Sequence, residues 1–262
     1  MLVKSATINV MTAAARKAAR GLLRDFGEVE QLQVSQKGPG DFVTAADHRV
    51  EKTLLQELKK ARPDYGFLLE EGGVVAGNDP HHTWVIDPLD GTTNFLHSIP
   101  HFAISIGLVR KDEPVAGVIY QPLTDEMFWA EKGGGAWVND RRLRVSARRR
   151  LDDAVIATGI PHQGRPEPER FLRQLQKVMA ATSGVRRFGA ASLDLAYVAA
   201  GRYEGFWEIG LKPWDIAAGI IIVREAGGYV SDFDTGQSPL ESGNVVAAND
   251  HLHAPLAALL KT

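Results

Sequence analysis

The stretch from Trp84 to Phe95 constrains this chain more than any other part of its sequence. The short apolar run 84–86 is typical of a buried strand, and it ends in two aspartates, Asp87 and Asp90. Pro88 fixes the backbone between them. Because two neighbouring carboxylates repel each other, we expect positive charge between them. Carboxylates at a rigid strand end bind hard cations well, so the sequence predicts a cation site here.

The residues that follow this strand suit a phosphate group. Gly91 allows a tight turn into Thr92, Thr93 and Asn94. If a helix begins there, the backbone N–H groups of Gly91 and Thr92 point toward an anion. A cation site and a phosphate site in one loop indicate phosphate-ester chemistry.

Composition excludes several classes of protein. The chain has 262 residues, of which 44% are hydrophobic, and a formal net charge of −2. This size suits one large domain or two compact halves, and the charge gives no general attraction to nucleic acid or anionic membranes. No apolar run is long enough for a membrane span, and the first residues lack an apolar signal core. There is no cysteine, so disulfides and thiolate metal sites are excluded. We expect a cytoplasmic protein.

Apolar spacing predicts a mixture of helices and strands. Three neighbouring strands after the aspartate loop form an antiparallel meander, whereas helices and strands alternate in the last hundred residues. The expected helices lie near 7–26, from about Ala45, and at 168–181, 190–200 and 216–226, with one more at the end of the chain. The expected strands lie at 64–69, 84–86, 103–109, 115–120, 127–131, 185–188, 203–207, 229–231 and 244–248.

These elements predict an α+β or α/β fold with layered, mixed sheets. The Pro- and Gly-rich segment 159–166 is the best candidate for a boundary within the chain. We therefore expect a single catalytic domain over 1–262, with an N-terminal α+β subregion at about 1–158 that holds the metal loop. A C-terminal α/β subregion would cover 159–262.

Three other acidic positions have both a structural and a functional interpretation. Asp47 and Thr44 fit a capping box at a helix start. Glu70 and Glu71 end a predicted strand, where glutamates are usually just solvated. Asp215 follows Pro213-Trp214 at a helix start, where a carboxylate complements the helix dipole.

Other motifs favour structural roles. Gly133 to Gly135 lie between two predicted strands, which is typical of a hairpin turn. His97 and His101 have helical spacing, but Pro100 interrupts the helix that a zinc site would need. Arginines are frequent between 141 and 150, a basic run that usually forms a solvated surface but that could dock RNA or an acidic partner.

Two segments together resemble the signatures of the inositol monophosphatase family. The segment 87–95, Asp-Pro-Leu-Asp-Gly-Thr-Thr-Asn-Phe, resembles the first signature, and 213–219, Pro-Trp-Asp-Ile-Ala-Ala-Gly, resembles the second. The resemblance covers nearly the whole chain and is greatest to the bacterial branch. It implies an αβαβα layered sandwich, a homodimer and two or three Mg²⁺ ions per subunit.

The resemblance also implies a role for each residue of the loop and its surroundings. Glu70, Asp87 and the carbonyl of Leu89 would hold a first metal, and Asp87, Asp90 and Asp215 a second; Glu70 would reach a third through water. Thr92, hydrogen-bonded to Asp47, would orient the attacking water. The phosphate and the substrate hydroxyls would contact Asp90, Gly91, Thr92, Gly189, Ala191, Glu208 and Asp215, with Asp194 lining the same pocket.

The implied activity is hydrolysis of myo-inositol 1-phosphate to inositol and phosphate by metal-activated water. Gly-Thr-Thr-Asn-Phe after Asp90 is similar to inositol monophosphatases, whereas relatives that cleave nucleotide or fructose bisphosphates usually differ there. The sequence leaves other substrates open: a related sugar or polyol phosphate, fructose 1,6-bisphosphate or a nucleotide bisphosphate. A regulatory interaction protein that keeps the phosphatase fold, with a macromolecular or nucleic-acid partner, is also left open.

Overall fold

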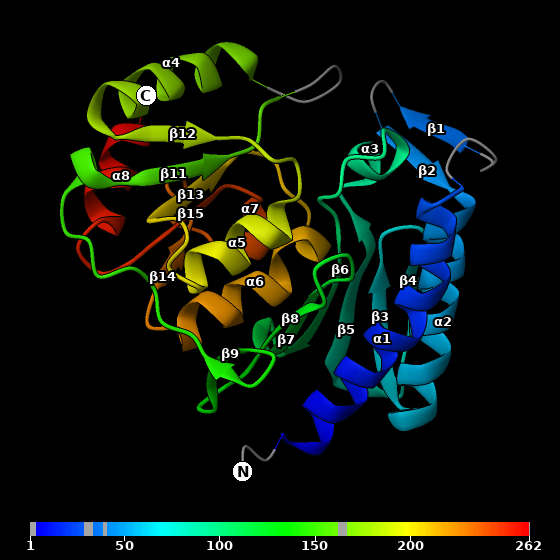
Figure 1. The fold of residues 1–262 in the computed structure, drawn as a ribbon. Helices are drawn as coiled ribbons and strands as arrows, with labels where there is room; N and C mark the ends of the chain where they lie inside the picture. The colour runs from blue at the N-terminus through cyan, green and yellow to red at the C-terminus, as the bar shows by residue number, and fades with distance from the viewer. Residues whose placement is uncertain (1–3, 29–33, 39–40, 162–166, 262) are drawn as a thin grey trace.

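The computed structural model describes residues 4–28, 34–38, 41–161 and 167–261, and these fold into stacked layers of helices and sheets (Figure 1). Two sheets lie roughly face to face, with helices between them and on both outer faces. The helices are α1 (Ala6–Phe26), α2 (Ala45–Ala61), α3 (Thr92–Leu96), α4 (Pro168–Ala181), α5 (Ala191–Ala199), α6 (Pro213–Glu225), α7 (Pro239–Ser242) and α8 (His253–Leu260).

The larger sheet comes from the N-terminal half of the chain. In the described residues its strand order is β10-β9-β8-β7-β6-β5-β3-β4, and β3 pairs with β5 in parallel while the other neighbours are antiparallel. Its strands are β3 (Tyr65–Leu69), β4 (Gly73–Val75), β5 (Asp79–Asp90), β6 (Ala103–Arg110), β7 (Glu113–Gln121), β8 (Glu126–Glu131), β9 (Gly135–Val138) and β10 (Arg141–Arg142). Separately, β1 (Val34–Gly38) and β2 (Asp41–Thr44) form a small hairpin.

The smaller sheet comes from the C-terminal half. Its order is β12-β11-β13-β15-β14, in which β11 pairs in parallel with both β12 and β13. The strands are β11 (Val155–Thr158), β12 (Gly184–Arg186), β13 (Gly205–Glu208), β14 (Tyr229–Ser231) and β15 (Val245–Ala248). A 3₁₀ turn at Leu151–Asp153 leads into β11.

Three apolar clusters hold the layers together. One packs α1 and α2 onto the outer face of the large sheet, and a second packs α5 and α6 between the two sheets. The third packs α4 and α8 onto the outer face of the small sheet. The order of layers is therefore αβαβα with mixed sheets, which confirms the fold expected from the sequence.

Local sequence explains how the first helices begin and which face they bury. Ser5 caps α1, because its hydroxyl accepts a hydrogen bond from the backbone N–H of Ile8 at 3.1 Å. Thr44 and Asp47 form the predicted capping box at α2. In α1 the side chains of Ile8, Met11, Ala15, Ala18 and Leu22 are buried at helical spacing, so this stripe faces the sheet.

Most predicted elements are present, with shifts at some ends. The meander of β6, β7 and β8 is antiparallel as predicted, and the hairpin between β8 and β9 turns at the glycines 133–135. The strand expected at 185–188 is instead 184–186, and the one expected at 203–207 is 205–208. Part of the expected boundary, residues 162–166, lies outside the described residues. No helix among those described is long and apolar enough to cross a membrane.

Candidate active site

A pocket of about 160 Å³ lies between the two halves of the chain, and six carboxylates line it. They come from separate elements: the end of β3, the end of β5, α5, the end of β13 and the start of α6. These residues are Glu70, Asp87, Asp90, Asp194, Glu208 and Asp215. The fold thus gathers acidic residues that are up to 145 positions apart in the sequence, counted from Glu70 to Asp215.

The end of β5 carries the two aspartates of the predicted cation site. The pairing of β5 with β6 becomes irregular between Asp87 and Asp90, so the regular alternation of the strand does not apply to this segment. Both side chains are buried, and the Asp87 carboxylate accepts a hydrogen bond from the backbone N–H of Leu89 at 2.9 Å. This loop therefore holds two carboxylates away from bulk water.

Burial and mutual repulsion disfavour the charged forms of these aspartates. Burial raises the pKa of Asp87 well above its ordinary value, and the negative charges of Glu70, Asp90 and Asp215 raise it further. Burial raises the pKa of Asp90 to about 6, although hydrogen bonds from Ser192 oppose this. Without a cation, the site holds more negative charge than its surroundings stabilise.

Gly91 and Thr92 turn the chain directly after Asp90. Gly91 has φ +95°, and a Cβ atom there would lie 3.0 Å from the carbonyl oxygen of His101, so the turn requires glycine. The Thr92 hydroxyl donates to the Leu89 carbonyl at 2.9 Å and approaches Oδ1 of Asp47 at 3.4 Å. Asp47 is fully buried behind Thr92 and does not line the pocket, and burial raises the pKa of its carboxyl.

Glu70 and Asp215 complete the acidic wall beside β5. Glu70 directly follows β3, where its backbone N–H donates to the Ile86 carbonyl at 3.2 Å. Asp215 lies in the first turn of α6 and its carboxylate accepts from the backbone N–H of Lys212 at 2.7 Å. The capping role and the place in the pocket are therefore compatible for Asp215.

The opposite wall comes from the C-terminal half. Gly189, Ala191, Asp194 and Glu208 all line the pocket. Burial raises the pKa of Asp194 well above its ordinary value, with the Glu208 charge as the next cause. Oδ1 of Asp194 has no hydrogen-bond partner among the described residues. Next to Gly189, Arg187 brings a cation to the same wall.

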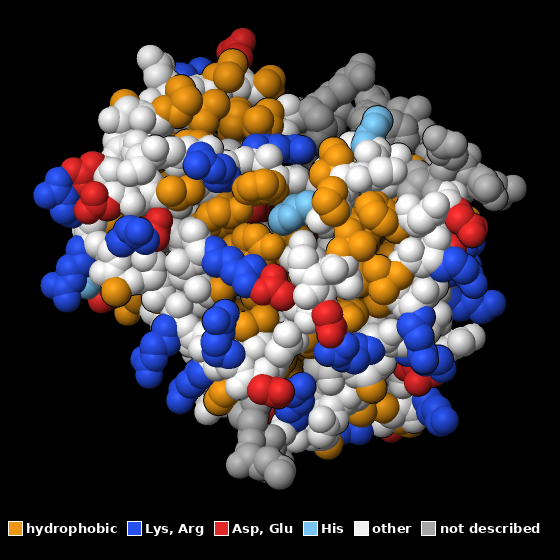
Figure 2. Space-filling model, in the orientation of Figure 1, with side chains coloured by type: hydrophobic (Ala, Val, Ile, Leu, Met, Phe, Trp, Pro, Cys, Tyr) orange, Lys and Arg blue, Asp and Glu red, His pale blue; other side chains and the backbone are white. Residues whose placement is uncertain are grey.

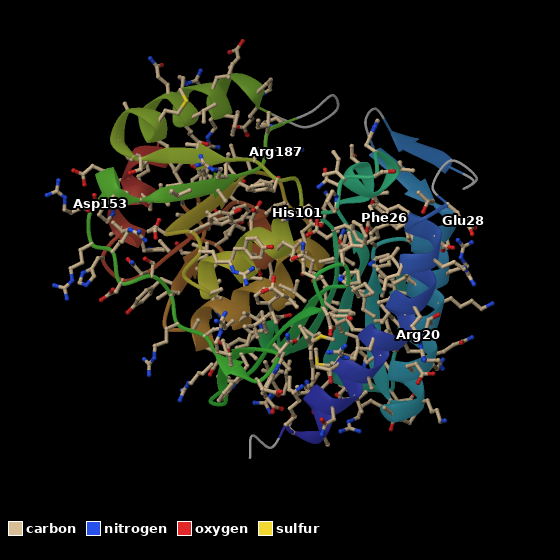
Figure 3. The ribbon with its side chains drawn as sticks, in the orientation of Figure 1. Arg20, Phe26, Glu28, His101, Asp153 and Arg187 are labelled. Carbon is tan, nitrogen blue, oxygen red and sulfur yellow. The ribbon has the colours of Figure 1, made fainter. Side chains whose placement is uncertain are left out.

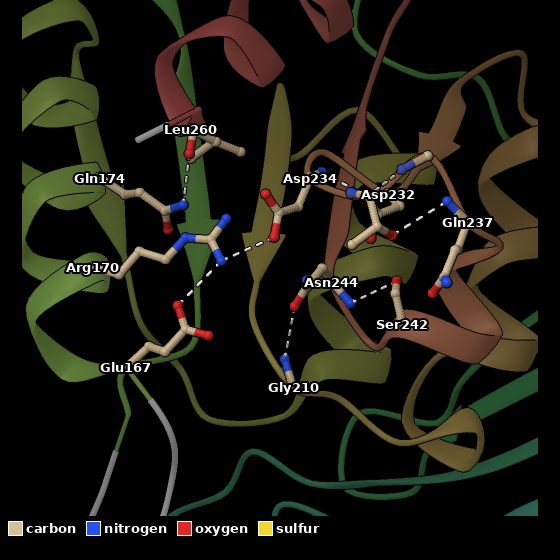
Figure 4. A network of polar contacts seen from close by, with 12 residues as sticks. Glu167, Arg170, Gln174, Gly210, Asp232, Asp234, Gln237, Ser242, Asn244 and Leu260 are labelled. Atoms are coloured by element: carbon tan, nitrogen blue, oxygen red, sulfur yellow. Dashed lines mark hydrogen bonds and ion pairs between the residues drawn. The ribbon is translucent and has the colours of Figure 1, made fainter.

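A network of polar contacts joins several segments of the C-terminal half (Figure 4). Arg170 of α4 donates to Glu167 at 3.1 Å and to Asp234 at 3.0 Å, which ties the start of α4 to the loop after β14. In the same view Gly210 donates from its backbone to Asn244 at 3.3 Å. The network thus fixes the neighbours of Phe171 and of the 209–211 segment, which line the pocket.

Some lining residues were not found from the sequence. They are Arg187 and the apolar residues Ile160, Pro161, Phe171, Ile209 and Leu211. These residues lie in loops or on α4, and whether their side chains point into the pocket depends on how the two sheets stack. His97 and His101 do not meet: His97 is exposed after α3, whereas the ring of His101 packs against Phe188 with centroids 5.1 Å apart. Figure 3 labels His101 and Arg187 where the two halves adjoin.

The donor set fits Mg²⁺. All candidate ligands offer carboxylate or carbonyl oxygens, and magnesium sites commonly use one or two carboxylates while the ion keeps several waters. In the part of the chain that the structure describes, no group of three or more His, Asp or Glu side chains lies in a geometry that could hold a metal ion as it stands. The fit to Mg²⁺ therefore rests on the chemistry of the donor atoms and on the raised pKa values of Asp87 and Asp90, which mark negative charge that the protein does not balance.

Comparison with known proteins gives consistent results. A model of the inositol monophosphatase family matches residues 4–262. The inositol-1-monophosphatase of Mesorhizobium japonicum is 58% identical over 260 residues, which cover 99% of this chain and 98% of that protein. A protein of Escherichia coli named Nus factor SuhB is 42% identical over 254 residues, covering 97% and 95%.

A solved structure agrees as well. The extragenic suppressor protein suhB from Bartonella henselae has a TM-score of 0.95 to this chain at 57% identity, with 98% of each chain covered. The layered fold, the acidic pocket and these relatives define a phosphoric monoester hydrolase. The chain belongs to the inositol monophosphatase family.

Proposed function

We propose that the protein hydrolyses myo-inositol 1-phosphate to inositol and phosphate with the help of Mg²⁺. The observation that carries the proposal is the buried Asp87 and Asp90 pair, which faces a pocket large enough for a small ester and adjoins the Gly91 turn. The name of the Mesorhizobium japonicum relative supports the inositol ester as substrate.

The acidic wall would hold the metal ions. The family resemblance suggests two or three Mg²⁺ ions per subunit. A first ion would be bound by Glu70, Asp87 and the carbonyl of Leu89, and a second by Asp87, Asp90 and Asp215. Glu70 would reach a third ion through water. When bound, such ions polarise the phosphoryl group, lower the pKa of water and neutralise the leaving oxygen.

The turn after Asp90 would position the reacting groups. The Thr92 hydroxyl lies between the Leu89 carbonyl and the Asp47 carboxylate, and it would orient the attacking water. The backbone N–H groups of Gly91 and Thr92 would donate to phosphate oxygens. Since Asp47 also caps α2, its carboxylate connects the orientation of Thr92 to the start of that helix.

The C-terminal wall would bind the alcohol half of the substrate. The backbone of Ala191 and the carboxylates of Glu208 and Asp215 would contact hydroxyl groups, with Gly189 close to them and Asp90 reaching from the other wall. Carboxylates accept hydrogen bonds from hydroxyls, so this wall suits a polyol. Arg187 on the same wall attracts anions, so the preference for a monoester over fructose or nucleotide bisphosphates rests on the name of the Mesorhizobium japonicum relative and not on the charge of this wall.

We also propose a homodimer, supported by apolar surface near the pocket. Phe188, Ile99 and Ile160 are 43%, 46% and 48% exposed, and large exposed apolar groups often mark an interface. Figure 2 shows hydrophobic side chains gathered on this face around a histidine. Burial lowers the pKa of His101, beside Phe188, to about 4, so it stays neutral in this apolar setting.

Regulatory docking through the basic run at 141–150 has weaker support. Arg148 pairs with Glu204 at 2.9 Å and Arg150 pairs with Asp152, so part of that charge is already neutralised within the chain. The E. coli relative carries the name of a Nus factor, which keeps such a role as the alternative.

The test is phosphate release from myo-inositol 1-phosphate with and without Mg²⁺, beside fructose 1,6-bisphosphate and an adenosine bisphosphate. We expect Mg²⁺-dependent turnover with at least a tenfold preference in kcat/KM for the inositol ester, a preference worth about 1.4 kcal/mol. An Asp90→Asn preparation made in parallel controls for contaminating phosphatases. Equal turnover of the bisphosphates would disprove the proposed specificity, and no turnover of any ester would leave the docking function as the better explanation.

A further inference from the structure

One oxygen of the Asp90 carboxylate is held from the far half of the chain. Oδ2 accepts a hydrogen bond from the backbone N–H of Ser192 at 2.7 Å and another from the Ser192 hydroxyl at 2.5 Å. Ser192 is fully buried and Asp90 is only 9% exposed, so neither donor is replaced by bulk water. The contact joins residues 102 positions apart, from the end of β5 and the first turn of α5.

The contact also completes the start of α5. The first backbone N–H groups of a helix have no partner within it, and a side chain at the N-cap position usually accepts from one of them. In α5 that position is Ala190, which has no polar side chain to serve as a cap. Asp90 therefore acts as the acceptor in its place, and its negative charge lies at the positive end of the helix dipole.

We propose that Ser192 is a positioning residue for the metal centre. It holds Oδ2 of Asp90, and this fixes the orientation of the carboxylate so that Oδ1 is the oxygen that binds the cation. This inference rests on the proposed Mg²⁺ site. The physical reason is that a ligand carboxylate binds more tightly when its orientation is fixed before the ion arrives. Hydrogen bonds from residues behind the ligands commonly change metal affinity 10- to 100-fold.

Removing only the hydroxyl separates this role from packing. Ser192→Ala keeps the backbone N–H bond and the start of α5 but leaves the Asp90 carboxylate with one donor fewer and freer to rotate. We expect roughly tenfold weaker Mg²⁺ binding, at the low end of the range for such contacts. Ser192→Thr restores a hydroxyl and should recover most of the affinity.

A matched control removes a buried hydroxyl elsewhere. Thr12 is 8% exposed, its hydroxyl donates to the Ile8 carbonyl at 2.8 Å within α1, and it does not line the pocket. Thr12→Val should lower the melting temperature slightly and leave Mg²⁺ affinity unchanged. It therefore shows what the loss of a buried hydroxyl costs in stability alone.

The measurement is the Mg²⁺ dissociation constant by calorimetry without substrate, together with the Mg²⁺ concentration for half-maximal hydrolysis. Ser192→Ala should raise both about tenfold, while KM for the ester at saturating Mg²⁺ changes less than twofold. If Ser192→Ala binds Mg²⁺ like the unmodified chain and only melts earlier, Ser192 is structural and the inference is wrong while the metal centre stands. If the unmodified chain itself binds no Mg²⁺, the metal centre fails and the inference with it.

Discussion

At the scale of single residues, the surroundings of Asp90 act in opposite directions on the charge of its carboxylate when no cation is bound. Its carboxylate is buried beside Asp87 and Glu70, which disfavours the charged form. Ser192 and the start of α5 favour the charged form of the same group. Because burial raises the pKa of Asp90 and the hydrogen bonds from Ser192 lower it, the pKa rises only to about 6.

Asp90→Asn separates the charge of this residue from its shape. An asparagine fits the same space and its carbonyl oxygen can still accept from Ser192, but it binds Mg²⁺ poorly. We expect kcat to fall by at least about 100-fold, or roughly 2.7 kcal/mol in transition-state free energy, while the circular dichroism spectrum is unchanged. Steady-state kinetics at saturating Mg²⁺ measures this. A variant with near-normal turnover would remove Asp90 from the site.

Local sequence points to Asp87 and Asp90 as a cation site, because they end an apolar run. Asp215 follows a Pro-Trp helix start, which explains it equally well as a helix-capping residue, so its place in the candidate site comes from the family resemblance. The structure brings all three to one pocket. Ser192 had no such signal, because a serine in an apolar helix start is ordinary and its partner is 102 residues away. Phe171 and Arg187 were missed for the same reason: their direction depends on how the sheets stack.

At the scale of elements, α6 packs closely against the large sheet. It contacts β5 to β9, and two glycines on β6 and β7 leave room for it. A Cβ atom on Gly117 would lie 2.6 Å from the Ala218 carbonyl oxygen, and one on Gly107 would lie 2.8 Å from Cβ of Ala217. Because Asp215 lies in the first turn of α6, this close packing sets how far that carboxylate reaches into the pocket.

Gly117→Ala tests the close packing. The added methyl meets the backbone of Ala218 and Cγ2 of Ile221, all on α6, so α6 must shift, and overpacking of this kind typically costs about 1–3 kcal/mol. Gly21→Ala in α1 is the matched control: nothing lies within 4 Å of the added methyl, and alanine favours helix by about 1 kcal/mol. Chemical denaturation should show opposite signs for the two variants. Equal effects would mean that α6 is not closely packed against β7.

Helices whose apolar residues recur at regular spacing could be predicted from the sequence. Strand ends that depend on pairing with neighbouring strands could not. The helix at 168–181 matches α4 end to end, because its apolar residues recur at helical spacing after a proline. By contrast, β5 extends from Asp79 to Asp90, well beyond the apolar run 84–86. Its first residues are polar and join the sheet through single pairings, Asp79 with Tyr65 of β3 and His82 with Arg110 of β6. Tertiary pairing outweighs local propensity there.

At the scale of the whole molecule, the pocket depends on both halves. The large sheet supplies Glu70, Asp87 and Asp90, and the part around the small sheet supplies Asp194 and Glu208. We propose that residues 1–262 form one catalytic domain, since neither half contains the complete pocket. Helices α5 and α6 pack against both sheets, and each carries a carboxylate of the pocket.

The stability of the whole chain should therefore depend on Mg²⁺ and on pH together. Because the pKa of Asp90 in the folded chain is raised to about 6, its contribution to stability is full below its ordinary value of 3.8 and is lost as the pH rises through 6. Through this group, the metal-free chain is therefore less stable at pH 7.5 than at pH 3.8. Asp87, whose pKa is raised in the same direction, adds to the loss.

Bound Mg²⁺ should reverse that loss, because it favours the charged carboxylates. At 100 times the dissociation constant, ligand binding stabilises a protein by about 2.7 kcal/mol, which for a chain of this size raises Tm by roughly 5–10 °C. We expect the increase on adding Mg²⁺ to be larger at pH 7.5 than at pH 5.0, where protons compete with the ion. Thermal melts with Mg²⁺ or with a chelator, at both pH values, measure this increase in Tm. In Asp90→Asn, the increase in Tm on adding Mg²⁺ and the loss of stability of the metal-free chain at pH 7.5 should both be smaller. An increase in Tm that is equal at the two pH values would show that the ion binds away from these carboxylates.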